Sequence, residues 1–273
     1  MINLIQKINY KDLIGHYFYI NNRIPYAIID NVVEYPNKFY RLYLKDISNN
    51  KYLKYIDLSY EEIITFYNRF LIRQERNEII KNRTIKQIVH FTKVSNLESI
   101  FENGLLSVNN LQNKLISYSP SDLNRLDGKL NKISTSISYP NYKMFYPKRM
   151  QNTNIDWTII TINPILIVHK LDSEFYKTNA ANGIYISDYT PTSNNDFKDM
   201  FYKEDRASFI PAYYTTDPQA EILIEDKISN NYFLSIETIK PNPKVKSLTR
   251  DAHINYNPNS SLFNARSDYK RWQ

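Results

Sequence analysis

The sequence predicts an α+β fold. Short runs rich in Tyr, Ile and Val alternate with turn residues, and only two segments show clear helical spacing of apolar side chains. The order of elements is strands, one long helix, then mostly strands, which favours α+β over a doubly wound α/β sheet. Glycine is scarce, with four in 273 residues, and neither GxGxxG nor GxxxxGK[ST] occurs. A Rossmann dinucleotide site and a P-loop are therefore excluded.

The first part of the chain reads as a small β-rich domain. Turn residues separate four expected strands, which are Tyr17–Asn21, Tyr26–Val33, Phe39–Asp46 and Tyr52–Asp57. This spacing predicts a small barrel or a strongly twisted sheet. Ser59 and Glu62 then form a capping box that begins a helix, whose polar end leads to Arg83. We place a domain boundary there, with residues 1–83 before it and residues 84–273 after it.

The second domain is expected to contain one short helix and several strands. Ser95 and Glu98 predict a second capping box, and Gly104 stands where a helix C-terminus favours a positive φ. Residues 188–206 read as a loop. The expected strands are Ile85–His90, Ile133–Ser138, Trp157–Ile162, Ile165–Val168, Ala220–Ile224 and Tyr232–Ile239.

Composition narrows the class of protein. Lys and Arg number 35 against 28 Asp and Glu, giving a net charge of +7 that favours anionic partners, nucleic acid above all. The abundance of Asn, Ile, Lys and Tyr also fits an AT-rich genome, which weakens that argument. The absence of cysteine excludes a disulfide framework, a zinc–thiolate site and a cysteine nucleophile. The apolar runs are too short to span a bilayer, so we expect a soluble, cytoplasmic protein.

Three polar groups lie beside expected strands of the second domain. His90 ends one strand, Ser134–Ser136 lies within another, and Gln219 and Glu221 begin a third. Each alone is more typical of a structural or surface residue. Together, a histidine, a Ser-Thr-Ser strand and a Gln-x-Glu pair in this order are the layout of ADP-ribosyltransferases.

The chain resembles one branch of these enzymes, the DarT-like nucleic-acid ADP-ribosyltransferases of toxin–antitoxin systems. The resemblance covers roughly Thr84 to Gln273 and leaves the first domain unexplained. The matching segments follow one another in order at sensible spacing. They are Ile88–Thr92, Asn96–Leu97, Asn103–Leu105, Asn124–Asp127, Ile133–Tyr142, Met144–Phe145, Asn179–Ala181, Thr216–Glu221, and Arg266–Tyr269 with Trp272.

The resemblance implies an ADP-ribosyltransferase (PARP-like) fold, a split β-sheet core with few helices, that uses NAD as co-substrate and needs no metal. Its catalytic residues would be Glu221 and Arg125. Cleavage of the NAD glycosidic bond passes through an oxocarbenium-like ribose, which a carboxylate at Glu221 would stabilise. The guanidinium of Arg125 would clamp the pyrophosphate. His90 would hydrogen-bond NAD, with Phe91 and Thr92 forming the wall beside the nicotinamide.

Other positions are implied to bind the two substrates. Ser134, Thr135 and Ser136 would line the nicotinamide pocket, and the ring of either Tyr139 or Tyr142 would stack on the leaving group. A glutamine two residues before the catalytic glutamate accompanies acceptors other than arginine, nucleobases included, which assigns Gln219 to the acceptor.

Two cations are candidates for contact with the acceptor strand. A base inside a duplex cannot reach such a pocket, so the expected acceptor is single-stranded DNA or RNA. Lys148 and Arg149 would track its phosphate backbone, although an ordinary solvated loop is an equal reading. Such an activity is toxic to its host and implies an antitoxin partner, with a role in phage defence.

Rival functions remain at this stage. RNA as acceptor is the nearest, and a related scaffold removes 2′-phosphates from RNA using NAD. Asp217, Glu225 and Lys227 suggest a metal-dependent nuclease, which magnesium dependence would reveal. A non-enzymatic, basic nucleic-acid-binding module is the third alternative. The first domain is hypothesised to have a targeting or regulatory role.

Overall fold

The computed structural model describes residues 9–20, 24–119, 128–182, 189–202 and 206–272. The chain divides into two compact units. The first contains Met1–Asn77 with Ile167–Leu171, and the second contains Glu78–Leu166 with Asp172–Gln273. Among the described residues, no helix combines the length and the apolar character that crossing a bilayer requires.

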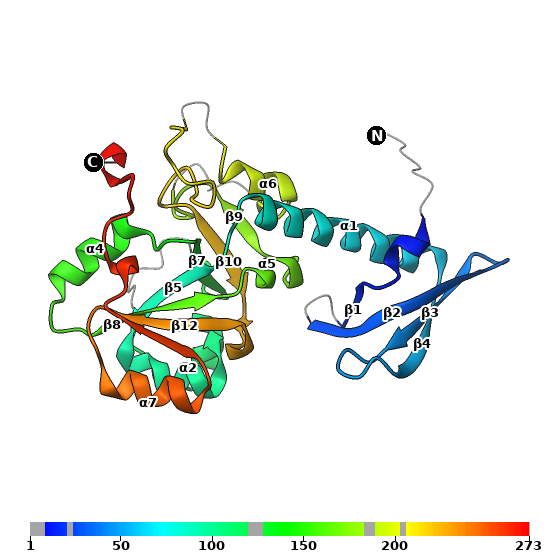
Figure 1. Cartoon of the computed structure of the whole chain (residues 1–273), viewed down its shortest axis with the longest axis horizontal. Coiled ribbons are helices and arrows are strands. Elements are labelled where there is room, and N and C mark those ends of the chain that lie inside the picture. The colour runs from blue at the N-terminus through cyan, green and yellow to red at the C-terminus, as the bar shows by residue number, and fades with distance from the viewer. Residues whose placement is uncertain (1–8, 21–23, 120–127, 183–188, 203–205, 273) are drawn as a thin grey trace. The chain divides into compact units, whose positions relative to one another are not determined.

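The first unit is a four-stranded antiparallel meander with one long helix (Figure 1). A short 3₁₀ helix, Tyr10–Leu13, comes before the sheet. The strands pair in chain order and are β1 (Tyr17–Ile20), β2 (Ile24–Tyr35), β3 (Phe39–Lys45) and β4 (Tyr52–Leu58). The four expected strands are thus confirmed within a few residues. They form a sheet with β1 and β4 at its edges.

Helix α1 (Tyr60–Asn82) packs against one face of this sheet. Leu42 and Leu44 of β3 share a buried cluster with Ile63 and Phe70 of the helix. The predicted capping box is confirmed, because Ser59 N–H donates to Glu62 Oε2 at 2.8 Å and Glu62 N–H donates to Ser59 Oγ at 3.3 Å. The helix therefore begins where the local sequence specifies.

The second unit is built on a seven-stranded mixed sheet with the order β13-β12-β8-β5-β7-β10-β9. In β8 every residue is buried, including Thr158 and Thr161, because both faces of this central strand are covered. The strands are β5 (Ile88–Lys93), β7 (Lys132–Ile137), β8 (Trp157–Ile162), β9 (Glu174–Tyr176), β10 (Glu221–Glu225), β12 (Phe233–Thr238) and β13 (Asn255–Pro258). A separate two-stranded sheet joins β6 (Leu105–Leu106) to β11 (Lys227–Ile228).

The large sheet is split in its middle. Strands β5 and β7 pair over only two positions, Ile88 with Ile137 and Val89 with Ser136. Beyond them β5 continues along β8 as far as Lys93, whereas β7 continues along β10 as far as Lys132. The two halves therefore diverge after Val89, and the split-sheet α+β core expected from the sequence is confirmed.

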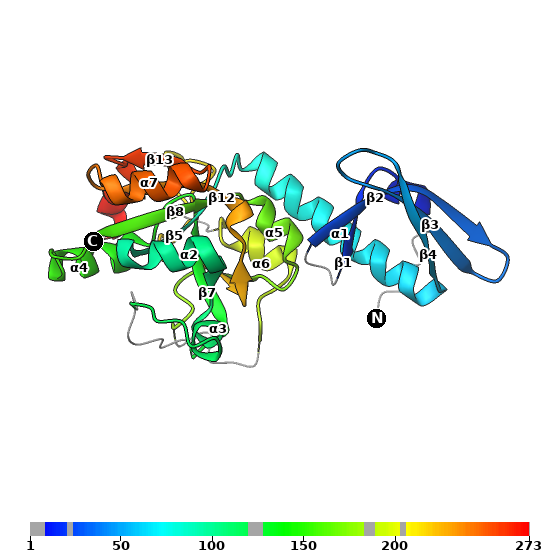
Figure 2. The same ribbon diagram turned by 90° about the horizontal axis from the view of Figure 1, so that it is seen from below.

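Short helices surround this sheet (Figures 1 and 2). Helix α2 lies beside α7, and an ion pair of 3.0 Å between Lys244 Nζ and Glu98 Oε1 joins them. Gly104 ends α2 with φ +79°, and a Cβ there would come within 2.7 Å of the Ile228 carbonyl oxygen, so glycine is required. The helices are α2 (Leu97–Asn103), α3 (Val108–Asn113), α4 (Tyr142–Gln151), α5 (Ile165–His169), α6 (Asn194–Asp199) and α7 (Pro243–Asp251).

Three local predictions were wrong. The expected strand Ile165–Val168 is part of helix α5, because a short buried apolar run follows Pro164, which favours the first turn of a helix. Ser95 caps no helix, since α2 begins only at Leu97, after a 3₁₀ turn. The expected loop 188–206 contains α6, which begins with a capping box between Ser193 and Asp196.

Candidate active site

A cavity of about 420 Å³ lies where β5 and β7 separate. Both strands contribute to its walls, together with α2, the segments around Leu106 and Asn179, and the start of β10. Most of the binding residues expected from the sequence line it. They are His90, Phe91, Thr92, Ser134, Thr135, Ser136, Gln219 and Glu221.

His90 takes its orientation from the split in the sheet. Its Nδ1 lies 2.8 Å from the carbonyl oxygen of Ser134, across the gap that backbone pairing leaves open. A carbonyl oxygen only accepts, so Nδ1 carries the proton and donates it. In the neutral ring, Nε2 is then the acceptor. The ring is thereby fixed in a tautomer able to accept a hydrogen bond from a hydroxyl or amide.

Thr92 and Thr135 are held by hydrogen bonds that the sequence gives no sign of. Asn96 Nδ2 donates to Thr92 Oγ1 at 3.0 Å and to the Ser119 carbonyl at 2.9 Å. The Thr135 hydroxyl donates to the Ile222 carbonyl at 2.9 Å, and so ties β7 to β10. These contacts fix the strands from which the serines and Glu221 project.

Glu221 is the first residue of β10 and has only 6% of its surface exposed. Its backbone pairs with Tyr176 of β9, and its Oε2 accepts a hydrogen bond of 3.2 Å from the Ala180 N–H. A carboxylate is thus held at the cavity by a strand on one side and a backbone donor on the other. Gln219, two residues earlier, lines the same cavity.

A second carboxylate, Glu174, lies on the neighbouring strand β9 and is bound by two lysines and a tyrosine hydroxyl. Glu174 receives Lys129 Nζ at 2.6 Å, Lys132 Nζ at 3.1 Å and the Tyr176 hydroxyl at 2.7 Å. Burial alone would raise the pKa of Glu174, but these three donors outweigh burial and hold the pKa below its ordinary value. Lys132 also lines the cavity, and its ammonium lies 3.1 Å from Glu174 Oε1 and 3.9 Å from Glu225 Oε2.

Asn141 is a cavity residue that the sequence analysis did not assign. It is the N-cap of α4, and its Oδ1 accepts from the Met144 N–H at 3.2 Å. Its Nδ2 is buried and has no hydrogen-bond partner in the described part of the chain. An oriented donor without a partner in a cavity wall fits a ligand that offers an acceptor. The sequence contained a sign of this role, because asparagine is one of the residues preferred at a helix N-cap.

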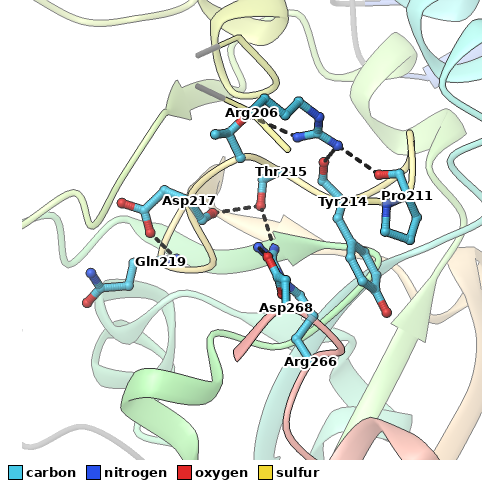
Figure 3. A network of polar contacts seen from close by, with 9 residues as sticks. Arg206, Pro211, Tyr214, Thr215, Asp217, Gln219, Arg266 and Asp268 are labelled. Atoms are coloured by element: carbon cyan, nitrogen blue, oxygen red, sulfur yellow. Dashed lines mark hydrogen bonds and ion pairs between the residues drawn. The ribbon is translucent and has the colours of Figure 1, made fainter. Parts of the chain in front are cut away.

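Two arginines, the half-buried Arg206 and the buried Arg266, hold the loop that leads into Gln219 and Glu221 (Figure 3). Arg206 donates to the carbonyls of Pro211 and Tyr214, at 2.8 and 2.9 Å, and to Thr216 Oγ1 at 3.0 Å. Burial lowers the pKa of Arg206. The guanidinium thus supplies the donors that a regular element would supply, and fixes the backbone at Pro211 and Tyr214, eight and five residues before Gln219.

Arg266 closes the same loop from the C-terminal segment (Figure 3). It forms a two-point ion pair with Asp268, with both N–O distances 2.6 Å, and donates to Thr215 Oγ1 at 3.3 Å. Thr215 in turn donates to the Asp217 carbonyl at 2.7 Å, and Asp217 Oδ1 accepts from the Gln219 N–H at 2.8 Å. A continuous chain of hydrogen bonds therefore connects Arg266 to Gln219.

Two tyrosines and one arginine assigned to substrates lie elsewhere. Neither Tyr139 nor Tyr142 is among the residues that line the cavity. The Tyr139 hydroxyl donates to the Ser261 and Asn264 carbonyls, so its ring anchors the C-terminal segment. Arg149 Nη2 donates to the Phe263 carbonyl at 2.6 Å, so this side chain also contacts the C-terminal segment, and its contact with a phosphate backbone stays a prediction.

The remaining assignments are only partly placed. Lys148 lies on α4, so the expected loop at this cluster is a helix. Arg125 lies outside the described residues. Asp217 lies in the turn before β10, and Glu225 is the last residue of that strand. The described residues contain no cluster of three or more His, Asp or Glu side chains that could bind a metal.

The chain was compared with curated proteins, with solved structures and with family profiles. None of the curated proteins matches the sequence. Among solved structures, DarTG of Thermosipho africanus in complex with ADP-ribose matches with 17% identity and a TM-score of 0.48, over 65% of this chain and 51% of that one. The chain thus spans about half the length of that protein. DarT of Thermus sp. 2.9 matches in complex with NAD+ (12% identity, TM-score 0.42) and with ADP-ribosylated ssDNA (12%, 0.46). These matches cover 65% and 66% of this chain, and 97% of DarT in both.

The profile of one family, described as "DarT: ssDNA thymidine ADP-ribosyltransferase, DarT", matches residues 89–252. That segment is more than half of the chain and contains His90, the Ser-Thr-Ser strand and Glu221. The resemblance and the glycosyltransferase type of reaction that it implies are confirmed. The chain belongs to the DarT family of ADP-ribosyltransferases.

Proposed function

We propose that this protein transfers ADP-ribose from NAD+ to a thymine base in single-stranded DNA and releases nicotinamide. The observation that supports this most directly is the position of Glu221, a buried carboxylate at the divergence of the sheet within the segment that matches the family. The described DarT structures with NAD+ and with ADP-ribosylated ssDNA support the choice of donor and acceptor.

The chemistry follows from charge. The bond between C1′ of the ribose and the nicotinamide nitrogen breaks, and positive charge develops on the ribose. Glu221 stabilises that charge and binds the ribose hydroxyls. A nitrogen of the base forms the new bond to C1′ and loses its proton, while nicotinamide leaves neutral. Atoms and charges balance without an oxidant or a metal.

Other cavity residues bind and orient the donor. His90 accepts a hydrogen bond through Nε2, and Asn141 donates through Nδ2. Phe91, Thr92 and the serines of β7 shape the pocket, and Gln219 binds the acceptor base. Lys132 supplies positive charge near the phosphates of the donor.

We propose the biological role from membership of the DarT family. The protein acts in the cytoplasm as a toxin of a toxin–antitoxin or phage-defence system, and a partner protein neutralises it. The solved DarTG supports this assignment. We also propose that a domain boundary lies near Arg83, a few residues after Asn77, where the first segment of the first compact unit ends.

The test is incubation of purified protein with NAD+ labelled in the ADP-ribose part and either a single-stranded DNA pool or an RNA pool. We expect label on DNA, and none with Glu221→Gln, which keeps the side-chain volume and removes the charge. Glu225→Gln, on the same strand, is the matched control and should transfer normally. Label on RNA alone would show that the acceptor is RNA and would overturn the proposal of DNA. Undiminished transfer by Glu221→Gln would overturn the catalytic assignment.

A further inference from the structure

The sheet of the first unit has a second face that its own core does not use. In β3, Tyr40, Leu42 and Leu44 are buried in the cluster that α1 covers. Side chains alternate along a strand, so Arg41 and Tyr43 lie on the opposite face. Directly paired residues of antiparallel strands share a face, which places Tyr55 and Tyr35 there as well.

The side chains on this face form a continuous row across three strands. The Tyr35 ring is 6.2 Å from the Phe39 ring, and the Arg41 guanidinium is 5.6 Å from the Tyr35 ring and 4.0 Å from the Tyr55 ring. The Tyr55 ring lies 6.3 Å from the Tyr43 ring. We call these five residues the aromatic row.

The aromatic row is exposed although it is made of large rings. Tyr35, Phe39 and Tyr55 have 37%, 36% and 48% of their surface accessible. Asp57 holds the Arg41 guanidinium through two hydrogen bonds of 2.7 and 2.9 Å. Arg41 therefore presents a fixed planar face between two tyrosine rings. Rings arranged in this way across a sheet contribute little to folding and suit a partner with flat π-systems.

The charge around the row indicates which partner it takes. Between residues 38 and 58 the chain carries five Lys or Arg side chains and two Asp side chains; Asp57 pairs with Arg41 and Asp30 of β2 pairs with Lys45, so a smaller cationic excess remains. Planar bases joined by phosphates match both the rings and the cationic excess. Single-stranded nucleic acid is bound in this way elsewhere, by stacking on aromatic side chains beside positive charge.

We propose that the aromatic row binds single-stranded nucleic acid by stacking bases on Tyr35, Tyr55 and their neighbours. This inference rests on the proposed function, because a strand bound by the first unit raises the effective concentration of acceptor for the catalytic unit of the same chain.

The test measures binding of a fluorescein-labelled 20-nucleotide single-stranded DNA to the full-length protein by anisotropy, without NAD+. The double variant Tyr35→Ala/Tyr55→Ala should bind about 25-fold more weakly, since each lost stacking contact weakens binding about fivefold or more. Tyr35→Phe/Tyr55→Phe keeps the rings and should bind like the wild type. Ile47→Ala removes an exposed apolar side chain of the same hairpin, which has no ring, and is the matched control.

The outcomes separate this inference from the proposed function. Circular dichroism and thermal melting confirm that each variant is folded. Unchanged DNA affinity of the double alanine variant would overturn the inference and leave the row as a surface for a protein, while ADP-ribose transfer by the wild type would still support the proposed function. A wild type that binds DNA through the row and transfers nothing would contradict the proposed function alone. An equal loss with Ile47→Ala would show that the binding depends on apolar area in general, and would overturn stacking.

Discussion

Arg266 Nη1 lies 3.3 Å from the hydroxyl oxygen of Thr215, and this contact joins the C-terminal segment to the loop that precedes Glu221. Arg266 is 1% exposed and its side-chain partner Asp268 is fully buried. Because both side chains are buried, their two mutual hydrogen bonds hold the pair in place. The position of the loop therefore depends on both residues.

Removal of one member of this pair should destabilise the second unit strongly. Arg266→Met leaves the Asp268 carboxylate buried without its guanidinium, which costs about 3–5 kcal/mol. We expect the melting temperature of that unit to fall by about 6–20 °C in calorimetry. Arg266→Met/Asp268→Leu removes both charges and should recover part of the loss. A double variant less stable than Arg266→Met would contradict a role based on paired charge.

Loss of the Thr215 hydroxyl should affect the acceptor more than the donor. Thr215→Val breaks the connection between Arg266 and the turn at Asp217, and so loosens Gln219. We expect KM for single-stranded DNA to rise about fivefold, the worth of one hydrogen bond, while hydrolysis of NAD+ by water changes less. Thr249→Val is the matched control, because that buried hydroxyl donates to the Val245 carbonyl within α7. Equal losses of transfer and hydrolysis would argue against a role of Thr215 that concerns the acceptor more than the donor.

Asn141 should contribute to donor binding through its amide nitrogen. Asn141→Asp keeps the oxygen that caps α4 and removes the buried donor. We expect the Kd for NAD+ to rise about tenfold, and the melting temperature without ligand to fall as well, because the new carboxylate is buried. Thermal shift against NAD+ concentration measures both. Asn242→Asp makes the same change at the N-cap of α7, away from the cavity, and should leave the affinity for NAD+ unaltered.

Stability of the first unit should fall in mild acid because of His169. Burial, and then the neighbouring Arg73, lowers the pKa of His169 from 6.5 to about 4. Between these values the unfolded chain binds a proton that the folded protein does not, so the free energy of unfolding decreases as the pH falls from about 6.5 toward 4. The expected loss between pH 7 and pH 5 is about 2 kcal/mol.

Urea denaturation at the two pH values measures this loss. His169→Gln should remove most of the difference between them. His253→Asn, a change at an exposed histidine, should preserve it. A pH dependence that survives His169→Gln would assign it to other groups.

Local signals in the sequence predicted local structure well. The Ser59 capping box and the strand Trp157–Ile162 appear as expected, since each depends on neighbours within a few residues. Ile165–Val168 was assigned to a strand because four apolar residues carry no period. Only the surrounding fold decides between a buried strand and a buried helix.

The candidate site was predicted unevenly for a related reason. His90, the serines of β7 and Glu221 could be found because they occur in a fixed order on segments that the sequence predicts as strands, and all of them line the cavity. The contact of Arg149 with the Phe263 carbonyl could not be predicted, since Phe263 lies 114 residues later in the chain. Contacts across such separations depend on tertiary structure, which no local pattern encodes.

The loop from Arg206 to Gln219, called the acceptor loop here, depends on Arg266. This dependence has a consequence for synthesis of the protein. A ribosome makes Glu221 and its loop more than forty residues before Asp268. Until that later segment has left the exit tunnel, Thr215 lacks the donor that holds it, and the catalytic unit is unfinished. A nascent chain therefore carries its carboxylate without a completed acceptor loop.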